Sequence, residues 1–166
     1  MSNSSPQFKK VVIGSDHAGF ELKEAIKVHA RQLGLDVEDK GCFSLESVDY
    51  PDYSGLVARG VLADSQAMGV LVCGSGIGVS IGANRYNGIR AALCFDAYLA
   101  ALSRAHNDAN VLCLGARVVG QPYALEIFDA FLNGPFEGSR HQTRIQKLDK
   151  LVVSEEGKSS CQASTC

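Results

Sequence analysis

Four apolar runs and one weaker segment that alternates apolar and acidic residues are separated by amphipathic stretches along most of this chain of 166 residues. Strands that alternate with helices in this way form a parallel sheet covered by helices on both faces. The alternation therefore predicts an α/β fold, a three-layer α/β/α, Rossmann-like domain with a five-stranded parallel sheet. The predicted strands are residues 10–14, 35–38, 68–73, 89–94 and 110–114. The predicted helices are residues 18–33, 51–66, 77–85, 96–106, 121–133 and 142–152.

The chain is expected to form one domain over residues 9–153. Its length suits a single sizeable core, and no internal repeat or change in composition marks a second domain. Residues 1–8 are predicted to be a short N-terminal extension. Residues 154–166 are small, polar and without periodicity, which predicts a flexible C-terminal tail.

Charge and hydropathy exclude several classes of protein. The net charge is −2, so no broad basic field is present to attract nucleic acid or an anionic membrane. No apolar stretch approaches the roughly 20 residues that span a bilayer, and residues 1–8 carry no signal-peptide core. We therefore expect a cytoplasmic protein with no nucleic-acid partner and no membrane partner.

Six cysteines are present, and in a cytoplasmic protein they are expected to be reduced. Cys94 and Cys113 lie within apolar runs and are interpreted as small buried hydrophobes. The sequence contains no C-x-x-C pair and no tight cysteine–histidine cluster of the kind that binds zinc. We expect neither a metal nor a cofactor.

A glycine-rich turn follows the third predicted strand and leads into a helix. The strand ends at Cys73, and residues 74–78 read G-S-G-I-G. Backbone N–H groups at a helix N-terminus bind anions and lower the pKa of a neighbouring thiol. The turn lacks G-x-G-x-x-G spacing because Val79 stands at the third glycine position, and it lacks the Lys-Ser/Thr of a P-loop. It is interpreted as an anion cradle beside a reactive thiol; the alternative is a buried cysteine next to a tight packing turn.

Two further groups of polar residues lie in the first half of the chain. Asp16 and His17 directly follow the first predicted strand. The alternative for Asp16 is a helix N-cap, whereas an imidazole at this place binds phosphate or shuttles protons. Asp49 precedes a predicted helix beside Tyr50, whose flat, hydrogen-bonding ring suits a sugar. The alternative for Asp49 is a turn residue.

The second half of the chain carries a histidine and several arginines. His106 and Asn107 close the fourth predicted helix, where the histidine is either a proton-transfer residue or a charge that complements the helix dipole. Arg117 follows the fifth predicted strand. Arg140 and Arg144 are four residues apart and share one helix face, which suits a phosphate or, alternatively, is a solvated basic face.

In this order, the motifs resemble those of the type B ribose-5-phosphate isomerases, a family that also includes allose- and galactose-phosphate isomerases. The matching segments are residues 14–19, 47–52, 73–80, 88–94 and 106–110, and the resemblance covers about residues 9–152. It implies interconversion of D-ribose 5-phosphate and D-ribulose 5-phosphate through an enediolate, in the non-oxidative pentose phosphate pathway, without metal or cofactor. It also implies a homodimer whose sites combine residues of both chains, and it leaves a tetramer open.

The resemblance implies a role for each candidate residue. Cys73 would be the base that moves a proton between C1 and C2, with Ser75 assisting the transfer. His106 and Asp16 would open the furanose ring, and Asp49 would border the sugar. The enediolate and the sugar would be held by Gly74, Ser75, Gly76, Ile77, Gly78 and Asn107, and the phosphate by His17, Arg117, Arg140 and Arg144. Of these residues, the partner of the chain that supplies Cys73 would contribute His106, Asn107, Arg140 and Arg144.

One branch of the family carries a glutamate in the glycine turn and lacks the cysteine. This chain has Val79 at that glutamate position and retains Cys73, so the resemblance implies the branch in which the cysteine is the base.

Two other functions stay open at this point. A cysteine hydrolase would use Cys73 as its nucleophile and His106 as its base, through a covalent acyl intermediate. A nucleotide-binding module would pair the glycine turn with Asp96, which follows it by about 20 residues, the distance expected of a ribose-binding acid.

Overall fold

The computed structural model describes residues 7–151. Most of the predicted N-terminal extension, the predicted C-terminal tail, and Cys161 and Cys166 therefore lie outside the described residues. Within residues 7–151, no helix is both long enough and apolar enough to cross a membrane.

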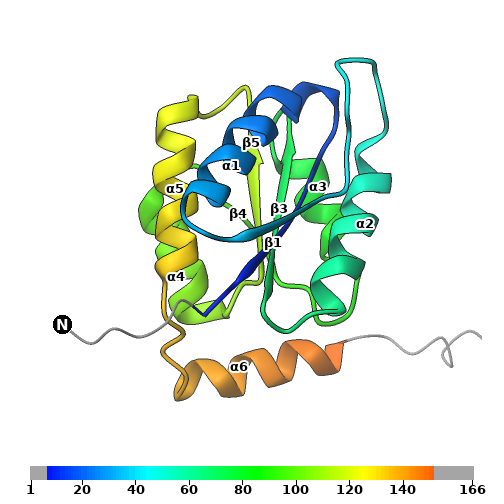
Figure 1. Cartoon of the computed structure of the whole chain (residues 1–166). Coiled ribbons are helices and arrows are strands. Elements are labelled where there is room, and N and C mark those ends of the chain that lie inside the picture. The colour runs from blue at the N-terminus through cyan, green and yellow to red at the C-terminus, as the bar shows by residue number, and fades with distance from the viewer. Residues whose placement is uncertain (1–6, 152–166) are drawn as a thin grey trace, which may run out of the picture.

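Five parallel strands form one sheet in the order β2-β1-β3-β5-β4, which confirms the predicted fold class. Figure 1 shows the strands running side by side through the middle of the domain. Their bounds are β1 Lys10–Ser15, β2 Asp36–Asp39, β3 Ala67–Cys73, β4 Ala91–Leu93 and β5 Val111–Gly115. All seven residues of β3 are buried, as expected for a central strand.

The fourth strand is shorter than the apolar run that predicted it. Ile89 and Arg90 lie before the strand. The Ile89 N–H donates to the Tyr86 carbonyl and closes a turn, and the Arg90 N–H donates to the Asn110 side chain. These two N–H groups are therefore not available to a sheet ladder. Apolar character alone does not distinguish such a buried turn from a strand.

Helices occupy the predicted stretches with small shifts at their ends. They are α1 Phe20–Gln32, α2 Tyr50–Leu62, α3 Ile77–Ala83, α4 Ala97–Asn107, α5 Gln121–Asn133 and α6 Arg140–Leu148, with 3-10 turns at His17–Gly19 and Asp149–Leu151. The prediction for the second helix ran four residues too far. Its C-terminal end is followed by a turn in which the Asp64 carboxylate accepts a hydrogen bond from the Gln66 N–H.

Helices cover both faces of the sheet, which gives the three predicted layers. One core packs α1, α4 and α5 against alternate strand residues such as Val11 and Ile13, and the other packs α2 and α3 against intervening residues such as Val12. Figure 1 shows α6 lying apart from these layers, across the edge where the strands begin.

The fold places a topological switch point at the C-terminal ends of the central strands. The chain leaves β1 towards α1 on one face and leaves the neighbouring β3 towards α3 on the other face. The connections separate at this point, and open α/β sheets bind their ligands at such a topological switch point. The predicted residues after β1, β3 and β5 all lie at this edge.

Gly19 allows the turn after β1 to lie directly on β3. A Cβ at this position would come within 2.5 Å of the Val72 carbonyl oxygen. We expect Gly19→Ala to lower the free energy of unfolding by about 1–3 kcal/mol, because backbone must shift to admit the methyl group. Urea denaturation measures this loss. Gly120→Ala is the matched control, since a Cβ there has no atom within 4 Å; equal stability of the two variants would contradict the prediction.

Candidate active site

Cys73 lies at the carboxyl end of the central strand and is in contact with the glycine turn. It is the last residue of β3, its exposed fraction is 5%, and its Sγ accepts a hydrogen bond from the Gly76 N–H at 3.1 Å. Gly76 has a φ of 78°, and a Cβ there would lie 2.5 Å from the Leu93 Cδ1. The turn therefore needs glycine at this position, both for its left-handed backbone and for its close packing.

Arg117 brings a positive charge to the same turn. Its backbone N–H donates to the Gly74 carbonyl at 3.0 Å, and its guanidinium carbon lies 3.5 Å from the place of a Cβ at Gly74. The thiol, the turn and this arginine are thus assembled by β3 and β5, whose pairing continues to Cys73 and Gly115. This arrangement is suited to an anionic ligand.

The turn after β1 brings Asp16 and His17 to this edge. The Asp16 N–H donates to the Val72 carbonyl at 3.1 Å, next to Cys73 in the chain. One oxygen of the Asp16 carboxylate accepts the Gly19 N–H at 3.0 Å, so the capping interpretation is confirmed for that oxygen. The His17 Nδ1 accepts a hydrogen bond from the Val48 N–H at 3.3 Å. A neutral His17 therefore carries its proton on Nε2.

The residues at the start of α2 also lie beside the glycine turn. Asp49 is exposed and is the N-cap residue of α2 without a side-chain capping bond. Tyr50 lies against the glycine turn, since a Cβ at Gly78 would come within 2.7 Å of its ring. The Tyr50 ring, predicted from the sequence to suit a sugar, thus lies next to the glycine turn.

The described cysteines are free thiols with different surroundings. Burial raises the pKa of Cys94 to about 11 and raises the pKa of Cys113 well above its ordinary value. Both thiols therefore stay protonated at neutral pH, which agrees with their interpretation as small hydrophobes. Asp96, the acid of the nucleotide-binding alternative, caps α4 by accepting the Leu99 N–H at 2.7 Å. Its position is explained by that local role.

The other predicted residues lie at the opposite edge of the sheet. Asn107 ends α4 and precedes the first residue of β5 by only four positions, so α4 brings His106 and Asn107 to the edge where strands begin. Arg140 and Arg144 lie on α6 at that same edge (Figure 1). Within one chain, the structure does not bring these four residues to Cys73.

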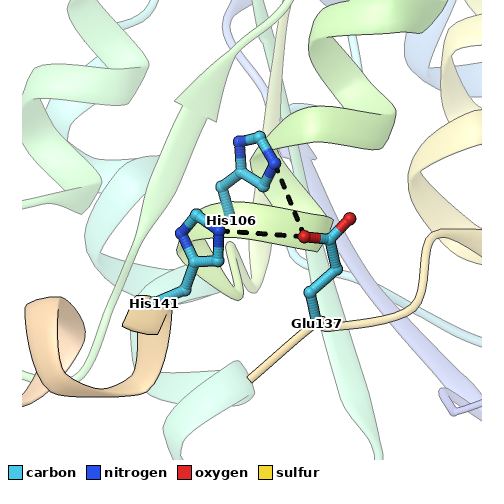
Figure 2. A group of neighbouring side chains, drawn as sticks. All are labelled: His106, Glu137 and His141. Carbon is cyan, nitrogen blue, oxygen red and sulfur yellow. Dashed lines mark ion pairs between the residues drawn. The ribbon is translucent and has the colours of Figure 1, made fainter. Parts of the chain in front are cut away.

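Two residues that the sequence did not assign to the site join His106. Figure 2 shows His106, Glu137 and His141 converging from the end of α4, the connection after α5 and the start of α6. The two imidazole rings are stacked with centroids 4.4 Å apart, and each Nε2 lies 3.7 Å from a Glu137 oxygen. Glu137 carried no sequence signal, because it lies outside any periodic segment and reaches His106 only through tertiary packing.

This cluster has the composition of a metal site but not the orientation. Its three ligand atoms lie within 4.8 Å of one another, and it is the group of three such His, Cys, Asp or Glu side chains found within residues 7–151. An imidazole binds a metal along the lone pair in its ring plane, about 2.0–2.1 Å from the nitrogen for zinc. The two ring planes are inclined by only 5°, so they do not meet near the rings. No ion can lie in both planes while the rings are stacked.

A cavity of about 850 Å³ also lies at the edge where the strands begin. It is lined by residues 84–92, Ser103, Asn107, Ala109 and the end of α6 with the turn after it. Asn107 is the predicted site residue among them, and Cys73 does not line this cavity. The cavity therefore includes one predicted site residue, Asn107, but not the predicted base, Cys73.

Comparison with known proteins identifies the family. The ribose/galactose isomerase family matches residues 11–148. The chain belongs to this family. It is 48% identical over 143 residues to ribose-5-phosphate isomerase B of Escherichia coli (strain K12), which covers 86% of this chain and 96% of that protein.

Solved structures show the same fold over the same length. Ribose-5-phosphate isomerase B of Clostridium thermocellum is 48% identical with a TM-score of 0.84, covering 85% of this chain and 95% of that one. The Mycoplasma genitalium enzyme, solved with bound ribulose-5-phosphate, is 42% identical with a TM-score of 0.83, covering 85% and 94%. The resemblance found in the motifs is thus confirmed at the level of the family and the fold.

Thiol labelling tests the assignment of the buried cysteines. At pH 8, a thiol with a pKa of about 11 is ionised to about one part in a thousand, and burial also blocks the reagent. We expect Cys94 and Cys113 to stay unmodified when the native protein is treated with iodoacetamide and mapped by mass spectrometry. Protein unfolded in urea is the control, in which both are labelled. Native labelling at the rate of the unfolded chain would contradict the assignment.

Proposed function

We propose that this chain is an aldose–ketose isomerase that interconverts D-ribose 5-phosphate and D-ribulose 5-phosphate. The observation that carries the proposal is a buried thiol at the end of β3 whose sulfur accepts a glycine-turn N–H, in a chain of the ribose/galactose isomerase family. The Mycoplasma genitalium relative with bound ribulose-5-phosphate supports this choice of substrate. The finer assignments of a cytoplasmic location and a place in the non-oxidative pentose phosphate pathway belong to the same proposal.

Cys73 is the base in this proposal. Its thiolate takes the proton from C2 of the open-chain aldose, the electron pair of that C–H bond forms the C1–C2 double bond, and the carbonyl oxygen on C1 becomes an enediolate oxygen. The proton on O2 passes to O1, the electron pair left on O2 forms the C2 carbonyl, and the electron pair of the C1–C2 double bond takes the proton from the Cys73 thiol to C1. Such a step needs a poised base and hydrogen-bond donors aimed at the developing charge. The thiol and the N–H groups of residues 74–78 supply both, with Ser75 assisting the proton between the oxygens.

The aldose must first be opened from its furanose form. The C1–O4 bond breaks, its electron pair goes to O4, and O4 takes a proton while O1 loses one as the C1 carbonyl forms. In the proposal, His106 gives the proton to O4 and Asp16 takes the proton from O1. The second Asp16 oxygen is the one for this role, because the first accepts the Gly19 N–H.

The phosphate is held from two sides. His17 and Arg117 approach it from the edge that carries Cys73, and Arg140 and Arg144 approach from the other chain. Guanidinium groups bind phosphate through paired hydrogen bonds, and this remote binding holds the sugar in reacting geometry. Asp49 and Tyr50 border the sugar between the phosphate and the glycine turn.

The site is completed by a second copy of the chain. Cys73 and His106 lie at opposite edges of one sheet, so the proposed mechanism requires the His106 edge of a partner to face the Cys73 edge. A two-fold axis satisfies this requirement twice and gives two equivalent sites per homodimer. Exposed apolar side chains on α3 and around the start of α4 support such an interface between two chains; they are Ile77, Ile81, Phe95 and Tyr98.

A cysteine hydrolase built from the same residues finds less support. His106 is not within reach of Cys73 in one chain, and no described feature forms an acyl pocket beside the thiol. In the composite site the pair would meet, so an acyl adduct on Cys73 after treatment with activated esters distinguishes the two functions.

The base assignment predicts a selective loss of catalysis. We expect Cys73→Ala to lower kcat for ribose 5-phosphate by about 10²–10⁴-fold, because proton transfer loses its acceptor while phosphate binding keeps its arginines. A coupled assay of ribulose 5-phosphate formation measures kcat, and calorimetry with inorganic phosphate measures the remaining affinity. Cys94→Ala is the matched control, because Cys94 is also a buried cysteine and directly follows a strand of the same sheet, β4. A Cys73→Ala enzyme with more than a tenth of wild-type activity would remove Cys73 as the base.

A further inference from the structure

The stacked pair of His106 and His141 is held in place by the connection between α5 and α6. The Glu137 N–H donates to the Ala105 carbonyl at 3.0 Å, one residue before His106. Gly134 packs on Arg104, and a Cβ there would lie 2.8 Å from the Arg104 Cβ. The connection is thus attached to the last turn of α4 at two points, which fixes Glu137 and the start of α6 relative to His106.

His141 is the buried member of the cluster. The exposed fraction of its side chain is 6%, against 36% for the side chain of His106. The Arg140 Nε donates to the His141 Nε2 at 3.4 Å, so this nitrogen is an acceptor and the ring proton lies on Nδ1. Burial lowers the pKa of His141, as do the charges of His106, Arg140 and Arg144, while Glu137 opposes them. His141 is therefore a neutral ring.

The neutral His141 ring contacts two residues of the proposed site, His106 and Arg140. One of its faces stacks on His106, with the two rings inclined by 5°, and one of its nitrogens accepts from Arg140. The His106 ring is the proton donor for ring opening, and Arg140 binds the phosphate. Glu137 adds a carboxylate oxygen 3.7 Å from the His106 Nε2, which attracts that edge of the ring whenever it is protonated.

We infer that His141 and Glu137 are positioning residues, which hold His106 and Arg140 of one chain in the orientation required by the site of its partner. The inference rests on the proposed function. Proton transfer to a sugar oxygen requires a nitrogen within hydrogen-bond reach and along a suitable direction, and a partly exposed side chain on the last turn of a helix does not keep one direction by itself. Stacking on His141 restricts the plane of the His106 ring. The Glu137 carboxylate determines which edge of the His106 ring faces Glu137.

Two substitutions at residue 141 separate the two contacts. His141→Ala removes both the stacking face and the acceptor of Arg140. We expect kcat for ribose 5-phosphate to fall about tenfold or more and KM to rise, because ring opening and phosphate binding both lose their support. His141→Phe restores a flat face but no acceptor, so we expect kcat to recover to within about threefold of wild type while KM stays raised.

Glu137→Gln tests the carboxylate without changing its shape. Because Glu137 is exposed, this variant is expected to fold normally, and we expect a decrease in kcat of about threefold or more with little change in KM. His29→Ala is the matched control. His29 also has a carboxylate partner, Asp129 at 2.7 Å, and an aromatic neighbour, Phe128, but it lies between α1 and α5. Its kcat and KM are expected to match the wild type.

A measurement without substrate completes the test. Long-range ¹H–¹⁵N spectra of the imidazoles in the free dimer are expected to show His141 neutral at pH 7 with its proton on Nδ1. The result that overturns the inference is a charged His141 or one protonated on Nε2. Kinetic parameters of His141→Ala and Glu137→Gln that match His29→Ala overturn it too, as does a His141→Phe enzyme that stays as slow as His141→Ala. Absence of isomerisation by the wild type would instead refute the proposed function.

Discussion

Parallel pairing of β1, β3 and β5 is the constraint on which the rest of this molecule depends. Register pairs such as Val72 with Leu114 carry three strands to their ends together, so the residues that follow them share one edge of the sheet. Each helix must then run back to the other edge before the next strand begins. The same rule that collects Asp16, Cys73 and Arg117 therefore takes the end of α4 away from them. In one chain, the Cys73 thiol and His106 therefore lie at opposite ends of the strands.

The contacts at each edge follow from this separation. At the carboxyl edge, close approach matters most: Gly19 lies on Val72, and Gly76 packs between Leu93 and Leu114. At the amino edge, polar contacts at the end of α4 matter more. Arg104 is fully buried and donates to Asp108 and the Ala109 carbonyl, which stabilises the last turn of α4 beneath His106. One edge presents backbone donors, and the other presents side chains held by neighbouring helices.

The sequence predicts the parts of this structure that depend on local patterns. Apolar runs predicted four of the five strands, the alternating residues 35–38 predicted the remaining one more weakly, and the turn after Cys73 could be recognised because glycine spacing is itself the local requirement. Ile89 and Arg90 were misassigned because their N–H groups find partners in a turn carbonyl and in the Asn110 side chain, which hydropathy does not record. Glu137 was missed for a related reason. Its contact with His106 depends on how the connection after α5 returns to α4, and no pattern within a short segment encodes that packing.

The central claim is that one site is built from two chains, and complementation between inactive variants tests it most directly. Cys73→Ala and His106→Ala disable opposite edges, so each homodimer has no intact site. When the two are unfolded together and refolded, about half of the dimers are mixed, and each mixed dimer has one intact site of two. We expect about a quarter of the wild-type isomerase activity in this mixture. Activity no higher than that of the separate variants, in a sample shown by mass spectrometry to contain mixed dimers, would contradict it.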